Sequence, residues 1–354
     1  MAAGDPEMRK RTQQAATRWS LTAVGIAGAV IVLVILLWYI VDVLLLVFAA
    51  VLLALLFRAP ADWLARRTPL SPGWSLTIAL LALAILVGLV AWLFGHVVAD
   101  QAEQLARRLP EIVRSVQERM ARYDWAMEYL RPEKILNGES EFIGKGLRAV
   151  TTTFGAVANL GIVVLMAVFL AAQPALYIDG MVRLVPIPRR PRAREVLDAA
   201  GHTLRRWLVG QLVLMLVVAI LTSTGLWALG VPFALALGLL AGLLTFVPYL
   251  GPILALAPAA LVALSESNLL AAYVVALYIG VQIVEGLLEP LVQQRAVYLP
   301  PALLIFAQIV LGILIGPLGV VLATPLAAAA MVAVNLIYVE DVLGDRDGAG
   351  TAAS

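Results

Sequence analysis

The residues best suited to chemistry lie on one apolar run, from about residue 269 to 290. Tyr278, Gln282, Glu285 and Glu289 follow one another there at helical spacing, so an α-helix brings all of them to one face. Ionisable side chains inside a membrane span are costly, and they usually face a cavity or a partner. This face is therefore a candidate pathway for a solute or an ion.

Two interpretations of Glu285 stay open from the sequence. In the first, its carboxyl is a proton or cation site, or a hydrogen-bonding group for a polar solute. In the second, it is a structural acid, protonated and bonded to a neighbouring helix. Glu289 lies beside Pro290 and near Arg295, so we expect it at the membrane interface. Gln211 is a milder case that fits a hydrogen bond between helices as well as a pathway.

Other chemistry finds little support among the residues. The chain has no cysteine and only two histidines, so we expect no metal site and no thiol nucleophile. No nucleophile elbow, Walker loop or dinucleotide fingerprint occurs, so we expect neither an enzyme nor a cofactor. The basic stretch 183–206 lacks interleaved aromatic residues, which disfavours nucleic acid and fits a loop near anionic lipid.

The composition places these residues in a membrane. Of the 354 residues, 62% are hydrophobic and only 14% are charged, whereas soluble domains carry about 25% charged residues. About 20 apolar residues span the hydrocarbon layer as a helix, and lipid leaves the backbone no other partner. We expect an all-α, polytopic transmembrane bundle with about six full spans, near residues 20–41, 43–57, 75–98, 153–177, 207–229 and 269–290. Only Asp42 separates the first two, which indicates either a minimal turn or one long, broken helix.

Two further apolar stretches are too long for one span and awkward for two. Residues 231–264 are interrupted at 248–252, and residues 302–336 at 316–319, by clusters of glycine and proline. Halves of about sixteen residues fit broken or re-entrant hairpins better than full crossings. Similar sequences follow the two interruptions and reach Pro258 and Pro325 respectively. Paired interruptions of this kind point to the binding site of a transporter, although prolines also kink membrane helices without any such role.

The charged regions suggest an orientation and a division of the chain. Basic residues cluster in the N-terminal tail, near 58–67 and in 183–206, and alternating spans place these on one side, the cytoplasm. Residues 99–150 are amphipathic and charged, which fits a solvated helical hairpin on the membrane domain, or a mobile gate or partner-docking element. We expect seven regions: a basic cytoplasmic tail (1–18), N-terminal spans (19–98), an extramembrane helical segment (99–150), a span (151–178), a basic cytoplasmic loop (179–206), a C-terminal membrane core (207–340) and a disordered tail (341–354).

Several motifs, taken in order, resemble the autoinducer-2 exporter family of bacterial and archaeal permeases. They are Gly210-Gln211, the run 225–232, the run Val247-Pro248-Tyr249-Leu250-Gly251-Pro252, Gln282 with Glu285 ahead of Pro290, and the run 316–327. The likeness covers about residues 20–340 and is strongest from 201 onward. It departs at Gly286, where an asparagine is expected, and before Pro300, where a histidine is common.

The resemblance implies a multi-pass protein of the cell's inner membrane that exports a small polar signalling molecule. It also implies sodium or lithium/proton antiport as an alternative, and a homo-oligomer with a pentamer as one candidate. A scaffold without transport activity is the alternative of another class. The expected partners are the lipid bilayer and a small polar solute, or a monovalent cation and a proton. The candidate pathway residues are Glu285, Gln282, Tyr278, Glu289, Pro248, Tyr249, Gly251, Pro252, Gly316, Pro317, Gly319 and Gln211.

Overall fold

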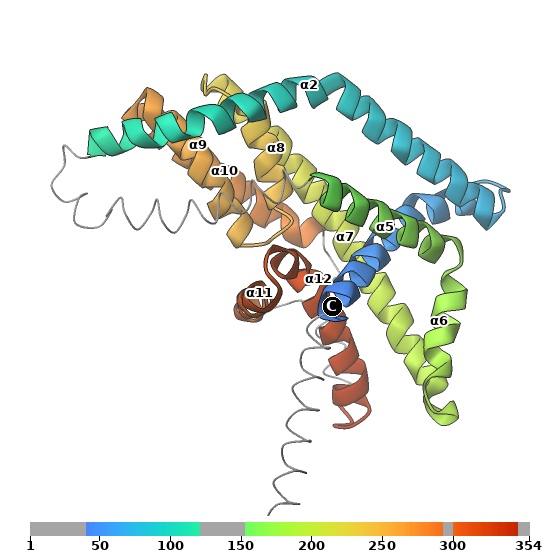
Figure 1. The fold of residues 1–354 in the computed structure, drawn as a ribbon. Coiled ribbons are helices and arrows are strands. Elements are labelled where there is room, and N and C mark those ends of the chain that lie inside the picture. Colours follow the sequence, from blue (N-terminus) through green and yellow to red (C-terminus); the bar gives the residue numbers. More distant parts are fainter. Residues whose placement is uncertain (1–39, 121–152, 293–299, 346–354) are drawn as a thin grey trace, which may run out of the picture. The chain divides into compact units, whose positions relative to one another are not determined.

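The computed structural model describes residues 40–120, 153–292 and 300–345, and all regular structure in these ranges is helical. The predicted all-α class is thus confirmed. The elements are a helix at Ile40–Arg67, α2 (Pro72–Met120), α5 (Thr153–Ala172), α6 (Pro174–Arg183), α7 (Arg190–Ala228), α8 (Ala234–Leu244), α9 (Leu250–Glu266), α10 (Asn268–Val292), α11 (Pro301–Ile315) and α12 (Pro317–Val334), with a short 3₁₀ helix at Ile187–Arg189 and a π-helix at Asn335–Glu340 (Figure 1).

Some predictions fall outside the described residues. They concern the tail 1–18, nearly all of the first span at 20–41, residues 121–150 and the end of the tail from 346. The chain forms two compact units, Met1–Phe48 and Ala49–Ser354. Of the first unit, residues 40–48 are described and are helical. Everything that follows concerns the second unit.

The length and composition of the helices match a multi-pass membrane protein. Among the described residues, five helices are long and apolar enough to cross a membrane, or six if one bent pair counts as a single span. The prediction of about six spans is therefore confirmed. The helix Ile40–Arg67 runs through Asp42 without interruption, so a tight turn at that residue was the wrong alternative.

The span expected at 153–177 is bent. α5 ends at Ala172, α6 begins at Pro174, and the two helices meet at 85°. Proline has no N–H to continue the helical ladder, and it disfavours helical angles at the residue before it. Gln173 accordingly leaves the helical region, with φ −134° and ψ 61°. The bend interrupts the helical backbone just beyond Ala171.

The segment 179–206, expected as a basic loop, is mostly helical. α6 reaches Arg183, and α7 begins at Arg190 and continues for 39 residues into the apolar core. Arginine, alanine, glutamate and leucine dominate 190–206, and all of them are good helix formers. Arg192 pairs with Glu195, Glu340 and Asp341, so the start of α7 is tied to the end of the π-helix.

α2 extends well beyond the membrane-crossing length. It runs unbroken for 49 residues, so the described start of the charged segment 99–150 continues the same helix. Gln101 accepts a hydrogen bond from the backbone N–H of Ala236, at the start of α8, at 3.0 Å. Ile112 is buried in the main hydrophobic cluster with residues of α8 and α9. This end of α2 therefore packs on the core.

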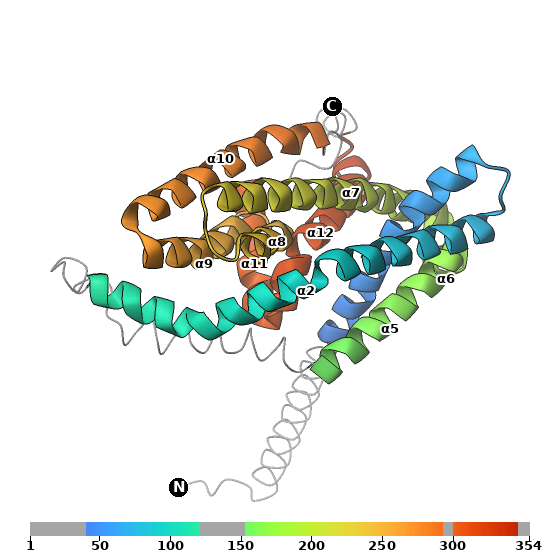
Figure 2. The ribbon, with the colours of Figure 1, turned by 90° about the horizontal axis from the view of Figure 1, so that it is seen from above.

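α7 is the central helix of the core and packs against α8, α10 and α12, as Figures 1 and 2 show. Gly238 and Gly242 of α8 face it so closely that a Cβ would overlap the backbone at Ser223 or Met215. Small residues permit such an approach between membrane helices. The Gly238-x-x-x-Gly242 motif thus has the packing role that the sequence indicates.

Candidate functional site

Both predicted interruptions are present, and the helices end where the glycine and proline clusters begin. α8 ends at Leu244 and α9 starts at Leu250, while α11 ends at Ile315 and α12 starts at Pro317. The prediction of two broken hairpins is confirmed. The halves are less even than expected: α8, α9 and α11 are short, whereas Pro317–Glu340 is long enough to cross a membrane.

The first break contains a tight, uncommon turn. Leu250 donates its backbone N–H to the carbonyl of Pro248 at 2.8 Å, which closes a three-residue turn around Tyr249. Tyr249 has φ 66° and ψ −49°, close to the rare γ-turn of positive φ. A non-glycine residue in such a conformation costs about 1–3 kcal/mol, which the surrounding contacts must supply.

Two buried glutamines hold the backbone of this break. Gln211 of α7 donates from Nε2 to the carbonyl of Thr245 at 2.6 Å, and Gln308 of α11 donates from Nε2 to the carbonyl of Pro248 at 3.0 Å. Both side chains are almost wholly inaccessible. A carbonyl released from a helix needs a partner inside a membrane, and these amides supply it.

The prediction placed Gln211 at the site but missed Gln308. The signal was available, because Gln308 is a lone amide in the apolar run of α11. Since Gln308 belongs to the second hairpin and Pro248 to the first, their hydrogen bond joins the two hairpins at a break.

The second break depends on one glycine. Gly316 has φ 84° and ψ −154°, a conformation almost confined to glycine. Pro317, which follows it, is exposed and begins α12. Its fixed φ suits the first position of a helix.

A buried glycine near the start of the second arm closes each hairpin. A Cβ on Gly251 would overlap the carbonyl oxygen of Leu244, and a Cβ on Gly319 would overlap that of Leu311. Each second arm then contains a proline, Pro258 or Pro325, at the same distance from its first residue. The two hairpins therefore share one construction, as their sequences suggest.

The predicted polar face of α10 does not meet a single environment. Tyr278 is 5% exposed and donates its hydroxyl to the carbonyl of Ala255 at 3.2 Å. Glu285 is half-buried, and its Oε2 has no hydrogen-bond partner among the described residues. Gln282 and Glu289 lie on the exposed surface of the chain. Only Tyr278 therefore reaches the core.

A groove between α9 and α10 brings three of the predicted residues together. It has a volume of about 350 Å³ and is lined by Pro252, Ile253, Leu256, Tyr278, Ile279, Gln282 and Ile283. Its lining is almost entirely apolar. The predicted residues thus fall into three places: the first break (Gln211, Pro248, Tyr249 and Gly251), this groove (Pro252, Tyr278 and Gln282) and the second break (Gly316, Pro317 and Gly319).

Several buried polar atoms near the breaks remain available. Oε1 of Gln308 and the hydroxyls of Thr222 and Thr324 have no hydrogen-bond partner within the described part of the chain. All three side chains are at most 2% exposed. Buried polar groups normally bond to protein or water, so this core can offer hydrogen bonds to water or to a polar solute. Among the described residues, no cluster of acids and histidines could hold a metal ion.

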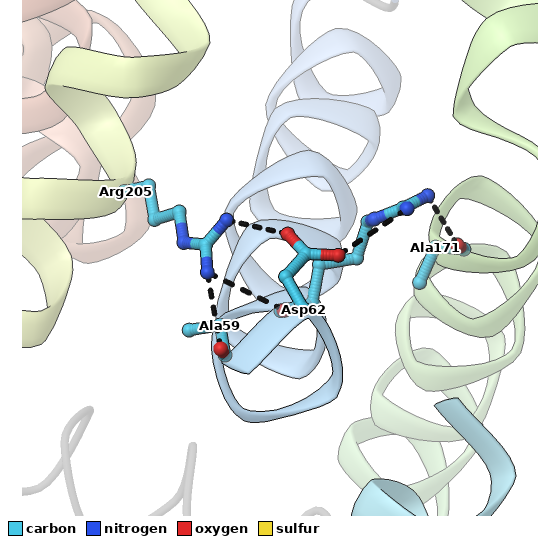
Figure 3. Close-up of polar contacts among 5 residues, drawn as sticks. Ala59, Asp62, Ala171 and Arg205 are labelled. Carbon is cyan, nitrogen blue, oxygen red and sulfur yellow. Dashed lines mark hydrogen bonds and ion pairs between the residues drawn. The ribbon is translucent and has the colours of Figure 1, made fainter. Parts of the chain in front are cut away.

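A second polar cluster, which sequence reasoning did not single out, lies at the basic end of the helix Ile40–Arg67 (Figure 3). Asp62 accepts a hydrogen bond from Arg205 of α7 at 2.6 Å and a longer one from Arg58 at 3.4 Å. Arg205 also donates to the carbonyl of Ala59, and Arg58 donates to that of Ala171, one residue before α5 ends. The cluster therefore joins three helices at one carboxylate.

Comparison with known proteins identifies the fold and its activity class. The model of the AI-2E family transporter matches residues 28–338. The chain belongs to this family. The resemblance seen in the sequence is thereby confirmed, and the AI-2E family is one of membrane permeases.

Relatives of the chain within this family carry transport names. "Putative transport protein YueF" of Bacillus subtilis (strain 168) is 27% identical over 71% of this chain and 74% of its own length. "Putative transport protein YhhT" of Escherichia coli (strain K12) is 25% identical over 82% and 84%. The AI-2 transport protein TqsA of the same strain is 24% identical over 84% and 85%. The chain is thus similar to these AI-2E proteins over most of their length.

Proposed function

We propose that this chain is a secondary permease that exports a small polar solute along its two broken hairpins. The hydrogen bond from Gln308 to Pro248 carries the proposal, because it joins the hairpins where the helical backbone is open. Unpartnered polar atoms beside this contact are suited to a solute with hydroxyl or carbonyl groups. The name of the relative TqsA supports autoinducer-2 as the first solute to test.

Autoinducer-2 counterflow in proteoliposomes tests this function. We expect Gln308→Leu to lower the rate by about tenfold, which corresponds to losing about 1.4 kcal/mol of stabilisation at the limiting step. Gln282→Leu is the matched control, because this amide lies on the exposed surface. Equal rates in Gln308→Leu and the wild type would remove the joined breaks from the mechanism. Absence of counterflow in the wild type would exclude autoinducer-2 as the solute.

Antiport of sodium or lithium against protons is a second candidate, and Glu285 favours it. Its Oε2 is buried without a partner among the described residues, as a carboxyl that exchanges a proton for a cation requires. A pH-sensitive dye trapped in proteoliposomes would respond when sodium or lithium is added. We expect Glu285→Gln to abolish the response and Glu289→Gln, on the exposed surface, to retain it. A response that persists in Glu285→Gln would assign the coupling elsewhere.

A homo-oligomer in the inner membrane, with both termini in the cytoplasm, remains part of this proposal. The exposed Gln282 and Glu289 on an apolar helix support a further subunit there, since lipid cannot solvate them. Chemical cross-linking of the protein in native membranes measures the number of subunits. A monomer under these conditions would contradict this part of the proposal.

A further inference from the structure

The polar cluster around Asp62 borders a cavity that the proposed transport path does not use. Its volume is about 260 Å³, and its charged lining consists of Arg58, Asp62 and Arg66. Pro72, at the start of α2, and Ala171 and Ala172, at the end of α5, complete the wall opposite. The cavity thus lies where one helix ends, the next begins and a third bends.

The charges around this cavity do not cancel. Arg205 neutralises Asp62 through their 2.6 Å contact, and Arg58 spends one nitrogen on the neutral carbonyl of Ala171. Arg66 forms an ion pair with no carboxylate in the described part of the chain, and its side chain is exposed. Two guanidinium groups therefore leave an excess of positive charge. Guanidinium binds phosphate with two parallel hydrogen bonds, so an anionic oxygen group fits this lining.

The first turn of α2 adds donors to the same wall. Pro72 is its first residue, and the turn contains no acidic side chain. The first N–H groups of a helix have no partner within the helix, and its dipole favours an anion at this end. These groups reinforce the arginines without being needed as the primary ligands.

The surroundings of the cavity have the character of a lipid headgroup layer. Trp63 and Trp74, one from each of the helices that meet here, are 52% and 66% exposed. Arg67 stacks on the ring of Trp63 at 5.1 Å. Exposed tryptophans collect where the membrane meets water. Beyond Trp74 the exposed residues of α2 are apolar, with Ile78 and Leu81 first, which provides a surface for acyl chains.

We propose that this cavity binds the phosphate group of an anionic phospholipid, with Arg58 and Arg66 as its ligands. A lipid accounts for both features together, since its phosphate meets the arginines while its chains cover the apolar side of α2. Basic pockets between membrane helices are suited to such headgroups. The bound lipid fixes the start of α2 to the bend between α5 and α6.

Native mass spectrometry of the purified chain, with phosphatidylglycerol or phosphatidylcholine added, tests the proposal. We expect the wild type to retain phosphatidylglycerol in preference to phosphatidylcholine. Arg66→Gln should weaken phosphatidylglycerol binding by about tenfold, as expected for the loss of one charged hydrogen-bonding partner. Arg67→Gln is the matched control, because it removes the same charge from a neighbouring residue that stacks on Trp63 and does not line the cavity.

Each other outcome overturns the proposal. Equal losses in Arg66→Gln and Arg67→Gln would indicate a general attraction to basic surface. Equal retention of the two lipids would exclude recognition of an anionic headgroup. Displacement of phosphatidylglycerol by millimolar inorganic phosphate alone would assign the cavity to a free anion. Because Arg66 is exposed, its substitution leaves the fold intact, and circular dichroism of each variant verifies this.

Discussion

The side chain of Gln308 donates a hydrogen bond to the carbonyl oxygen of Pro248, which lies 60 residues earlier in the chain. The same carbonyl accepts the backbone N–H of Leu250, so it has two donors. One donor closes the turn around Tyr249, and the other comes from the second hairpin. The conformation of the first break therefore depends on the position of α11.

Replacing Gln308 with leucine should destabilise the protein. The substitution keeps a similar volume but removes one hydrogen bond, which contributes about 0.5–1.5 kcal/mol to the free energy of unfolding. Unfolding of the purified protein in mixed micelles by sodium dodecyl sulfate measures this quantity. Gln282→Leu is the control and should change it by less than about 0.5 kcal/mol, since Gln282 is exposed. Equal effects of the two variants would show that the contact with Pro248 contributes nothing to stability.

A methyl group at Gly251 should be destabilising for a steric reason. The added Cβ overlaps the carbonyl oxygen of Leu244, so α8 and α9 must move apart, at a cost of about 1–3 kcal/mol. At Gly286 of α10 a Cβ meets nothing within 4 Å, so alanine should be neutral or slightly stabilising there. Thermal unfolding of both variants measures the difference. If Gly251→Ala unfolds at the wild-type temperature, the arms are not in contact there.

A methyl group at Gly316 should be destabilising for a conformational reason. Nothing lies within 4 Å of a Cβ at this position, yet its φ of 84° excludes alanine without strain of about 1–3 kcal/mol. Gly280→Ala, inside α10 and equally uncrowded, provides the control. Unfolding free energies of the two variants should differ by at least about 1 kcal/mol. A smaller difference would mean that α11 and α12 are connected in another conformation.

The pair Asp62 and Arg205 should show measurable coupling in a double-mutant cycle with Asp62→Asn and Arg205→Gln. Their side chains are 27% and 24% exposed, and the contact is charged at 2.6 Å, so we expect a coupling of about 1–2 kcal/mol. The pair Glu103 and Arg107 on α2 is the comparison, because its side chains are 61% and 78% exposed. Exposed pairs one helical turn apart contribute about 0.3–0.5 kcal/mol. Equal coupling in the two pairs would contradict a structural role for Asp62.

What the sequence predicted follows from local chemistry. Glycine and proline act on their own residue and its neighbours, so the breaks at 248–252 and at Gly316 could be located from composition alone. The same reasoning was available at Gln173 and Pro174, but a long apolar run concealed the bend. Helix periodicity likewise grouped the polar residues of α10 on one face.

What could not be predicted depends on contacts between distant residues. Periodicity does not tell which part of a helical face a neighbour covers, so it could not separate the buried Tyr278 from the exposed Gln282. Asp62 and Arg205 are 143 residues apart, and nothing near either residue indicates its partner. Gln308 could be noticed as a lone amide, but its acceptor on Pro248 requires the packing of two hairpins.

The hydrogen bond between Gln101 and Ala236 has a mechanical consequence. α2 is continuous from Pro72 to Gln101, and at 1.5 Å per residue this distance is about 44 Å. A tilt of about 5° at Pro72 would move Gln101 by about 4 Å, beyond the reach of one hydrogen bond. α2 therefore acts as a lever on the first hairpin. Any force that swings this long helix must either pull α8 along or leave its first N–H groups bare.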